Sequence, residues 1–162
     1  MNNLLIFGAG EHGMVAKETA ESMNFFDKID FLDDNISFAI GKFEEYKNFI
    51  NEYQYAFVAL GNNNLRMDWI NKLETASFTL VNLIHKSAIV SPSVILESGI
   101  IIEAGAVINT NSKVSKGVII SIGALIDHNV KIESGCHIRA GSVIKPNTNI
   151  SENVVIKENS SI

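Results

Sequence analysis

Aliphatic side chains occupy every sixth position of the second half of the chain, from Ile84 to Ile162, without one insertion. An amphipathic helix buries positions three and four apart and a half-buried strand buries every second position, so a strict period of six fits neither. Such a period is typical of a solenoid that turns a corner in every repeat. The fourteen positions are Ile84, Val90, Leu96, Ile102, Ile108, Val114, Ile120, Ile126, Ile132, Ile138, Ile144, Ile150, Ile156 and Ile162.

A second register, three residues before each aliphatic position, holds residues suited to left-handed turns. Eleven of its twelve members are Gly or Asn. These residues enter positive φ at the lowest cost, so the pattern predicts one tight turn in every six residues. The members are Ser93, Gly99, Gly105, Asn111, Gly117, Gly123, Asn129, Gly135, Gly141, Asn147, Asn153 and Asn159.

The turn register also has a longer period of eighteen residues. Gly99, Gly117 and Gly135 follow one another at this spacing, and so do Asn111, Asn129 and Asn147 in the same register. Each corner therefore has its own residue type, which predicts three six-residue faces per coil and a triangular prism of a little over four coils. These hexapeptides resemble the left-handed parallel β-helix of the hexapeptide acyltransferases. The left hand rests on that resemblance, because parallel crossovers are otherwise right-handed.

The first half of the chain begins with a pattern of strand, glycine loop and helix. Leu4 to Phe7 is a short apolar run, and the segment Gly8-Ala9-Gly10-Glu11-His12-Gly13 follows it before a helical pattern. The spacing matches GxGxxG, whose glycines permit a tight turn and a close approach of backbone N–H groups to a diphosphate. His12 could contact a phosphate or only help to begin the helix.

Alternating strands and helices follow, as expected for a parallel sheet of about four strands that binds its ligand at the carboxyl ends. The second strand ends at Asp33 and Asp34, where a carboxylate could accept from a ribose hydroxyl; the alternative is a solvated turn. The third strand stops at Gly61 and Asn62. The further elements that we expect are strands over 29–32, 55–60 and 78–83 and helices over 43–52 and through Arg66, Ile70 and Leu73. We therefore expect an α/β half-Rossmann domain over 1–83 and a β-helix over 84–162.

Only one mononucleotide half is present, which affects the choice of ligand. A dehydrogenase needs a second half for its dinucleotide, yet the sheet is expected to end near residue 83. A nucleotide-sugar needs one half for its diphosphate and leaves the sugar free to reach a second domain. We therefore expect a nucleotide-sugar here, with NAD as the alternative.

Composition narrows the classes of partner. The net charge of −5 and the pI near 5.3 provide no basic footprint for nucleic acid or for an acidic membrane surface. The chain begins without a charged segment followed by a long apolar run, and no stretch approaches eighteen apolar residues, so we expect a cytoplasmic protein. The one cysteine, Cys136, falls among the small residues of the coil, where a thiol is usually an apolar filler.

Several segments together resemble the sialic acid O-acetyltransferase family, and most closely its bacillosamine-pathway branch of UDP-4-amino-sugar N-acetyltransferases. They are the Gly8 to Gly13 loop, Phe31-Leu32-Asp33-Asp34, Val58-Ala59-Leu60-Gly61-Asn62-Asn63, Val81-Asn82-Leu83-Ile84-His85-Lys86-Ser87-Ala88, Leu125-Ile126-Asp127-His128 and Cys136-His137. The resemblance implies that the first domain holds the UDP-sugar. It also implies that the coil forms a homotrimer with acetyl-CoA between neighbouring coils. The residues expected to contact the sugar nucleotide are Gly8, Gly10, His12, Gly13, Asp33, Asp34, Gly61 and Asn62.

By the same resemblance, His128 is the general base that takes a proton from the attacking sugar amine, and Asp127 orients it. An imidazole is a neutral base at physiological pH, which suits this role; the alternative is an exposed corner residue. His137 is expected near the acetyl group, and acetyl-CoA is expected to contact His137, Ala140, Gly141 and Pro146. Pro146 stands where the family offers a glycine N–H to the thioester carbonyl, and proline has none to donate.

Spacing bears on where the chemistry occurs. His128 and His137 are nine residues apart, half of an eighteen-residue coil, so they are expected on different sides of the prism. They can share a site only across a subunit boundary. We therefore expect an acetyl-CoA-dependent sugar N-acetyltransferase without a metal. The alternatives are O-acetylation of a sialic-acid-like sugar and a non-catalytic relative shortened at Ile162, which binds a nucleotide-sugar without turnover.

Overall fold

A computed structural model describes residues 1–162, which divide into two compact units, Met1–Val81 and Asn82–Ile162. The division falls two residues before the expected boundary. Leu83 and Ile84 form a strand that pairs with Ile101 and Ile102, so Leu83 belongs to the coil and not to the first sheet.

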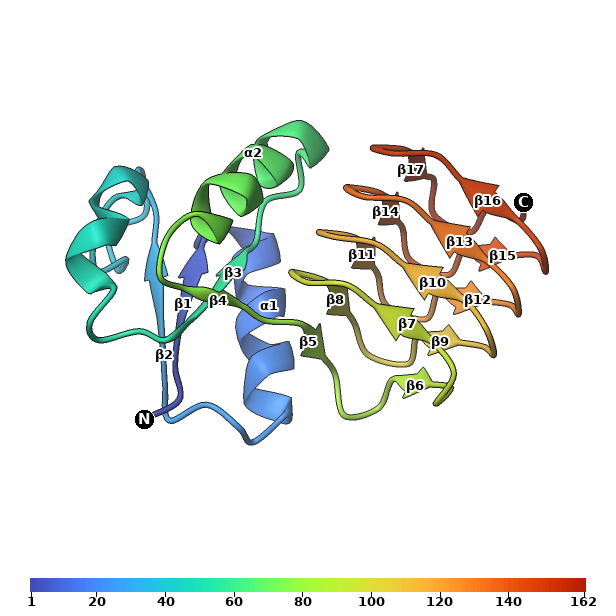
Figure 1. Cartoon of the computed structure of the whole chain (residues 1–162), viewed down its shortest axis with the longest axis horizontal. Helices are drawn as coiled ribbons and strands as arrows, with labels where there is room; N and C mark the ends of the chain where they lie inside the picture. Colours follow the sequence, from blue (N-terminus) through green and yellow to red (C-terminus); the bar gives the residue numbers. More distant parts are fainter. The chain divides into compact units, whose positions relative to one another are not determined.

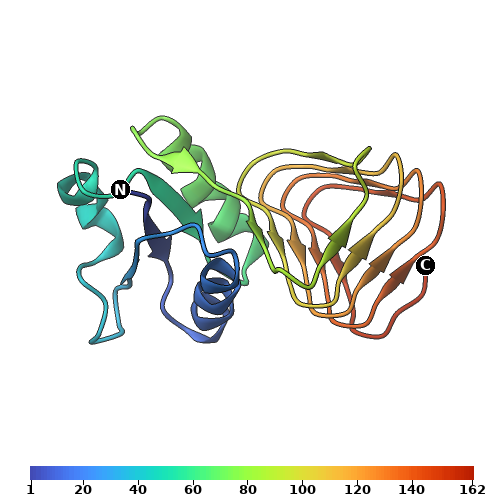
Figure 2. The same ribbon diagram turned by 90° about the horizontal axis from the view of Figure 1, so that it is seen from below.

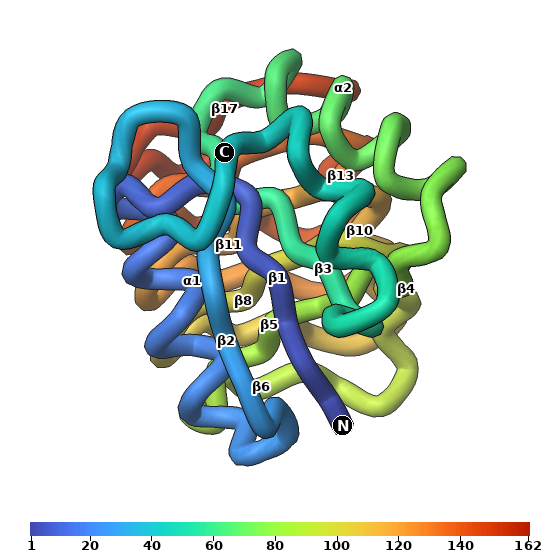
Figure 3. Tube along the Cα trace, turned by 90° about the vertical axis from the view of Figure 1, so that its left-hand side faces the viewer, coloured from blue at the N-terminus to red at the C-terminus, as the bar shows by residue number.

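The first unit is built on a parallel sheet of four strands in the order β2-β1-β3-β4 (Figure 3). In the register of the sheet, Phe7 at the end of β1 pairs with Leu32 and Val58, so three strands end level at one edge. The elements are β1 (Asn3–Phe7), α1 (Glu11–Ser22), β2 (Lys28–Leu32), η1 (Phe43–Phe49), β3 (Tyr55–Val58), α2 (Asn63–Glu74) and β4 (Thr79–Leu80).

Alternation along β1 divides its side chains between the two faces of the sheet. Leu5 and Phe7 belong to an apolar cluster with residues of η1 and α2, whereas Leu4 and Ile6 point to the opposite face, and all four are fully buried. Phe7 lies at the centre of this cluster, with four other rings whose centroids lie 5.6–6.5 Å from its own. These are the rings of Phe43, Tyr46, Trp69 and Phe78.

The segment expected as a helix over 43–52 is instead a 3₁₀ helix, η1, that ends at Phe49. Its aromatic residues Phe43, Tyr46 and Phe49 are spaced by three, which places them on one face of a helix with three residues per turn. A reciprocal contact begins the helix, since the Glu45 carboxylate accepts the backbone N–H of Lys42 at 2.6 Å. Neither α1 nor α2, at 12 residues each, has the length and apolar character to cross a membrane.

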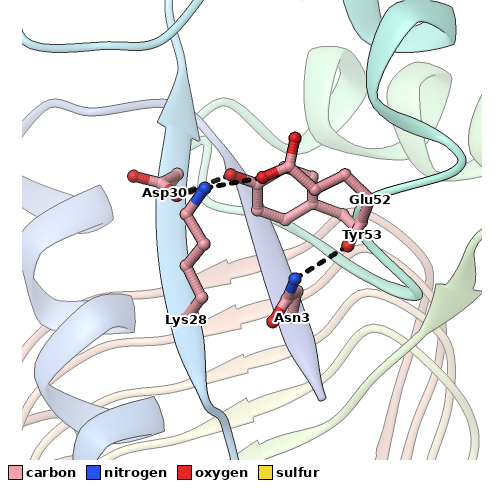
Figure 4. Close-up of polar contacts among 5 residues, drawn as sticks. All are labelled: Asn3, Lys28, Asp30, Glu52 and Tyr53. Carbon is pink, nitrogen blue, oxygen red and sulfur yellow. Dashed lines mark hydrogen bonds and ion pairs between the residues drawn. The ribbon is translucent and has the colours of Figure 1, made fainter. Parts of the chain in front are cut away.

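A network of hydrogen bonds and ion pairs lies at the end of the sheet where the strands begin (Figure 4). The buried Tyr53 donates its hydroxyl to Asp30 Oδ2 at 2.6 Å, and Lys28 Nζ lies 3.2 Å from Asp30 and 2.7 Å from Glu52. Asn3 donates its side-chain N–H to the Glu52 carbonyl at 2.8 Å. Burial and the hydrogen bond to Asp30 raise the pKa of Tyr53 to about 12.

The second unit is a left-handed parallel β-helix, with the coil that the hexapeptide pattern predicts and the hand that the resemblance implies. Its two-residue strands stack into three sheets, in the orders β16-β13-β10-β7, β17-β14-β11-β8-β5 and β15-β12-β9-β6 (Figures 1 and 2). The strands are β5 (Leu83–Ile84), β6 (Ile89–Val90), β7 (Ile95–Leu96), β8 (Ile101–Ile102), β9 (Val107–Ile108), β10 (Lys113–Val114), β11 (Ile119–Ile120), β12 (Leu125–Ile126), β13 (Lys131–Ile132), β14 (His137–Ile138), β15 (Val143–Ile144), β16 (Asn149–Ile150) and β17 (Val155–Ile156).

The turn register behaves as predicted. All eleven of its Gly and Asn residues have positive φ, between 54° and 72°, and Ser93 is the one member that does not. The sixth-position aliphatics form the core of the coil, and those from Ile102 to Ile156 are at most 9% exposed. Cys136 is fully buried beside them, as expected for a small apolar filler.

Candidate functional site

Two glycines of the Gly8–Gly13 loop are required by the fold itself. Gly8 has φ 108°, and a Cβ there would lie 2.7 Å from the Ala59 carbonyl oxygen, on the neighbouring strand end. A Cβ on Gly13 would collide with the carbonyl oxygen of Gly8. These glycines allow α1 to begin close behind β1, so their presence needs no ligand to explain it.

Gly10 is different, because it lies in open space. Nothing approaches within 4 Å of the position that its Cβ would take, and its φ of −74° suits any residue. Gly10 is the N-cap of α1 and has no side chain to cap that helix. The amino end of α1 therefore remains open, as a diphosphate site requires. Gly61, at the end of the third strand, is equally open, and His12 lies half-buried in the first turn of α1.

Asp33 and Asp34 lie at the same edge of the sheet, but the structure uses the Asp33 carboxylate internally. It accepts three backbone N–H groups, from Ala9 at 2.8 Å, Asn35 at 2.9 Å and Ile36 at 3.1 Å. Burial opposes the charged form, yet these three donors outweigh it and lower the pKa of Asp33. Asp33 thus ties the glycine loop to the loop after β2, while Asp34 accepts the Phe43 N–H at 3.1 Å through one oxygen.

The end of β3 is held by side chains of α2. Asn62 is the N-cap of that helix and accepts the Leu65 N–H at 3.0 Å, so its carbonyl oxygen has a structural task. Arg66 is fully buried and donates to the Leu60 carbonyl and to Asn63 Oδ1, both at 2.8 Å. A role for Arg66 at this edge was not predicted from the sequence. In the sequence, Arg66 lies at helical spacing from Ile70 and Leu73, on the apolar side of the predicted helix, and this position could have indicated its burial.

In the coil, His128 lies in the corner between β12 and β13. Its ring Nδ1 is 3.0 Å from the amide nitrogen of Asn129, and that amide also donates to Asn147 Oδ1 at 3.2 Å. Asp127 does not contact the ring. Its carboxylate accepts the backbone N–H of His128 at 2.7 Å and the side chain of Asn109 at 3.2 Å, so within one chain it shapes the turn, and Asn129 is the residue at the imidazole.

The orientation of the Asn129 amide and the tautomer of His128 depend on each other. When its N–H₂ group faces Nδ1, that nitrogen accepts and the proton of the neutral ring is on Nε2. A half-turn of the amide presents its oxygen instead, which places the proton on Nδ1 and leaves Nε2 free to act as a base. Because Asn129 also donates to Asn147, both amides must turn together.

His137 lies on β14, on a different face of the prism from the His128 corner. Its Nε2 is 3.0 Å from Ser121 Oγ. A surface pocket of about 330 Å³ opens beside it, lined by Ser121, His137, Arg139, Ala140 and Glu158. The pocket therefore brings together His137 and Ala140, two of the residues expected to contact acetyl-CoA, with Ser121, which was not predicted from the sequence. Ser121 is a polar residue in the corner directly after Ile120, and this position could have indicated a contact with a ligand.

A buried carboxylate lies next to this pocket. Glu103 is only 9% exposed and accepts the Ile122 N–H at 2.9 Å, one residue from Ser121. Burial raises the pKa of Glu103. Gly141 follows the pocket with φ 67°, and a Cβ there would collide with the side chain of Asn159.

Three consecutive residues of the corner at Pro146 have no backbone N–H to offer to an oxyanion. Pro146 lacks the group, the Lys145 N–H is bonded to the Ile162 carbonyl at 2.7 Å, and the Asn147 N–H is bonded to the His128 carbonyl at 3.1 Å. No group of three or more His, Cys, Asp and Glu side chains is placed to hold a metal ion.

Comparison with known proteins finds relatives that span both units. Residues 3–73 match the family described as the PglD N-terminal domain. The chain is 33% identical to the acetyltransferase domain of PglB from Neisseria gonorrhoeae FA1090, solved with acetyl coenzyme A; the TM-score is 0.95, over 99% of this chain and 82% of that one.

Two further structures share the architecture. PerB from Caulobacter crescentus, solved with CoA and GDP-perosamine, is 26% identical with a TM-score of 0.83, over 99% of this chain and 91% of that one. WeeI from Acinetobacter baumannii AYE is 13% identical with a TM-score of 0.69, over 99% and 94% of the two chains, and shows the common fold alone.

Proposed function

Because this chain belongs to the family that includes the acetyltransferase domain of PglB, and is therefore an acetyltransferase, we propose that it acetylates a nucleotide-linked amino sugar. The donor is acetyl-CoA and the acceptor is the amine of a UDP-linked 4-amino-4,6-dideoxy sugar. The observation that carries this proposal is the pairing of an open glycine-loop helix start with a histidine corner on a β-helix. PerB, whose structure holds CoA and GDP-perosamine, supports the general class of acceptor.

The reaction is a direct transfer. The amine nitrogen attacks the thioester carbonyl, the C–S bond breaks, and CoA leaves as the thiol. His128 takes the proton that the amine loses and returns one to the departing sulfur. An imidazole performs both steps near neutral pH without a metal. His137, with Ser121 beside it, lies near the acetyl group, and the pocket at Ala140 and Gly141 receives part of the coenzyme.

We also propose a homotrimer with sites between subunits. The outward side chains of the sheet that contains β12 are all aliphatic, and three of them are 37–64% exposed. The four side chains are Ile89, Val107, Leu125 and Val143, and all but Val107 are in the exposed group. The outward residues of the sheet that contains β13 are instead mainly polar, namely Lys113, Lys131 and Asn149 after Ile95. An exposed apolar stripe on one face of a prism is typical of a protein–protein interface.

The decisive experiment measures free CoA release with acetyl-CoA and a UDP-4-amino sugar. The native chain should turn over, and His128→Ala should lose at least about a hundredfold in kcat, the usual size of a general-base contribution. Equal rates in the two proteins would remove His128 from the mechanism. Nucleotide binding without CoA release in the native chain would indicate a binding protein instead.

The subunit arrangement has its own test. Leu125→Lys places a charge in the apolar stripe and should convert the trimer to monomers in light scattering, with loss of activity. Lys131→Leu, a change of opposite polarity on the neighbouring face, is the matched control and should leave the trimer intact. A fully active Leu125→Lys monomer would contradict sites between subunits.

A further inference from the structure

Phe38 presents an aromatic ring to solvent in the loop that follows β2. The side chain is 60% exposed, although a ring of this size normally contributes to a core. It is nevertheless supported on one side, since its centroid lies 5.8 Å from that of Phe31 at an interplanar angle of 77°. Phe31 itself is 5% exposed. The ring is therefore supported by Phe31 and largely exposed elsewhere.

The loop that carries Phe38 is held in place by an ordered set of hydrogen bonds. The Asp33 carboxylate accepts the N–H groups of Asn35 and Ile36, and the Ile40 N–H donates to the Phe31 carbonyl at 2.9 Å. The Asp33 N–H donates to the Gly41 carbonyl at 3.0 Å and closes the loop at its base. A rigid aromatic surface loses little conformational entropy when it binds a ligand.

The position of this loop relative to the glycine loop suggests the ligand. The Ala9 N–H donates to Asp33 Oδ2 at 2.8 Å, so the two loops are joined side by side at the ends of β1 and β2. In a half-site of this kind the diphosphate lies at the helix start and the ribose lies toward the end of β2. A base attached to that ribose continues outward over the loop that holds Phe38.

We infer that Phe38 is the stacking platform for the base of the nucleotide-sugar, an assignment that rests on the proposed function. Every base has a π-face, so a phenylalanine ring contributes affinity without selecting one base. Ile40, 41% exposed two residues later, extends the apolar surface. Phe38 therefore strengthens the binding of UDP and GDP alike, and any choice between them is made by other residues.

The test is calorimetric titration with UDP, GDP and inorganic pyrophosphate, which lacks a base. Phe38→Ala should weaken both nucleotides by about fivefold or more, the lower end of the range for one stacked base. Phe38→Tyr should keep native affinity, and pyrophosphate should bind all variants equally. Phe25→Ala is the matched control: Phe25 is 44% exposed and packs edge-on against Tyr55, but precedes β2 at the other end of the strand.

The outcomes separate the two proposals. Equal nucleotide affinity in the native chain and in Phe38→Ala would overturn the stacking assignment and leave the proposed function intact. A parallel loss of pyrophosphate binding in Phe38→Ala would also overturn the assignment, since it would show that the ring only supports the loop. A native chain that binds neither UDP nor GDP would overturn the proposed function, and the assignment with it.

Discussion

Alanine at Gly13 should lower the stability of the fold, whereas alanine at Gly10 should lower the affinity for a nucleotide, because only Gly13 is crowded by the protein itself. At Gly10 the added methyl meets open space at a φ that any residue adopts. Reduced freedom of the unfolded chain contributes about 0.4–1 kcal/mol of stability. The poorer N-cap costs a similar amount, about 0.5–1 kcal/mol. Unfolding stability should therefore change by less than about 1 kcal/mol.

At Gly13 the same methyl meets the Gly8 carbonyl oxygen, which the backbone holds in place. Overpacking of this kind costs about 1–3 kcal/mol, and the better helix propensity of alanine returns about 1 kcal/mol. A crowded backbone contact belongs at the upper end of the range, so we expect a net loss near 2 kcal/mol. Trp69 is the only tryptophan, and it is nearly buried in the first unit, so its fluorescence in urea reports on this unit.

Nucleotide binding should show the reverse order. A diphosphate on the amino end of α1 approaches Gly10 closely, and a methyl group there removes a hydrogen bond to a charged group, about 1.5–3 kcal/mol or roughly ten- to a hundredfold in Kd. Calorimetric titration with UDP and GDP measures this loss in Gly10→Ala. Native affinity in Gly10→Ala would show that no phosphate lies there, and native stability in Gly13→Ala would refute the packing argument.

Three further changes test other parts of the molecule. Asn129→Ala should remove the amide that contacts His128 Nδ1 and lower kcat, because the ring then loses the partner that fixes its orientation and tautomer; an unchanged kcat would contradict a role for the contact. Tyr53→Phe should cost about 1.5–3 kcal/mol in urea unfolding near pH 7, because the phenol donates to a charged acceptor, Asp30. The phenol pKa is raised to about 12 in the fold, so this contribution is present below pH 10 and is lost between pH 10 and 12, where the variant should converge with the native chain. Pro146→Gly should raise kcat by supplying a backbone N–H, and an unchanged kcat would show that the oxyanion donor lies at another corner.

The coil could be predicted almost residue by residue, because its two requirements each leave a pattern in the sequence. A narrow core needs an aliphatic at every sixth place, and each corner needs a residue that tolerates positive φ. Asn111 and Asn129 meet the second requirement at 57° each. The 3₁₀ character of η1 was also present as the spacing of three between Phe43 and Tyr46, but this spacing fits one face of an α-helix as well.

The candidate site was less predictable, because residue type does not reveal how a polar group is used. Asp33 and Asn62 were expected to meet the sugar nucleotide, yet Asp33 is engaged by three backbone N–H groups and Asn62 caps α2. Asp127 was expected at the His128 ring and instead accepts its backbone N–H. In each case the side chain accepts a nearby backbone N–H, and residue type alone does not reveal that use.

The positions of the two histidines bear on whether one chain can form the proposed site alone. His128 lies in a corner between two sheets and His137 lies on a third, so no rotation of side chains brings them together within one prism. In the corner above His128, Lys145 and Asn147 use their backbone N–H groups within the chain and Pro146 has none. The proposed base in one corner and the proposed acetyl pocket on a separate face are two halves of a site that one chain does not bring together. Packing of the aliphatic stripe beside His128 against a second chain is the arrangement that would complete the site.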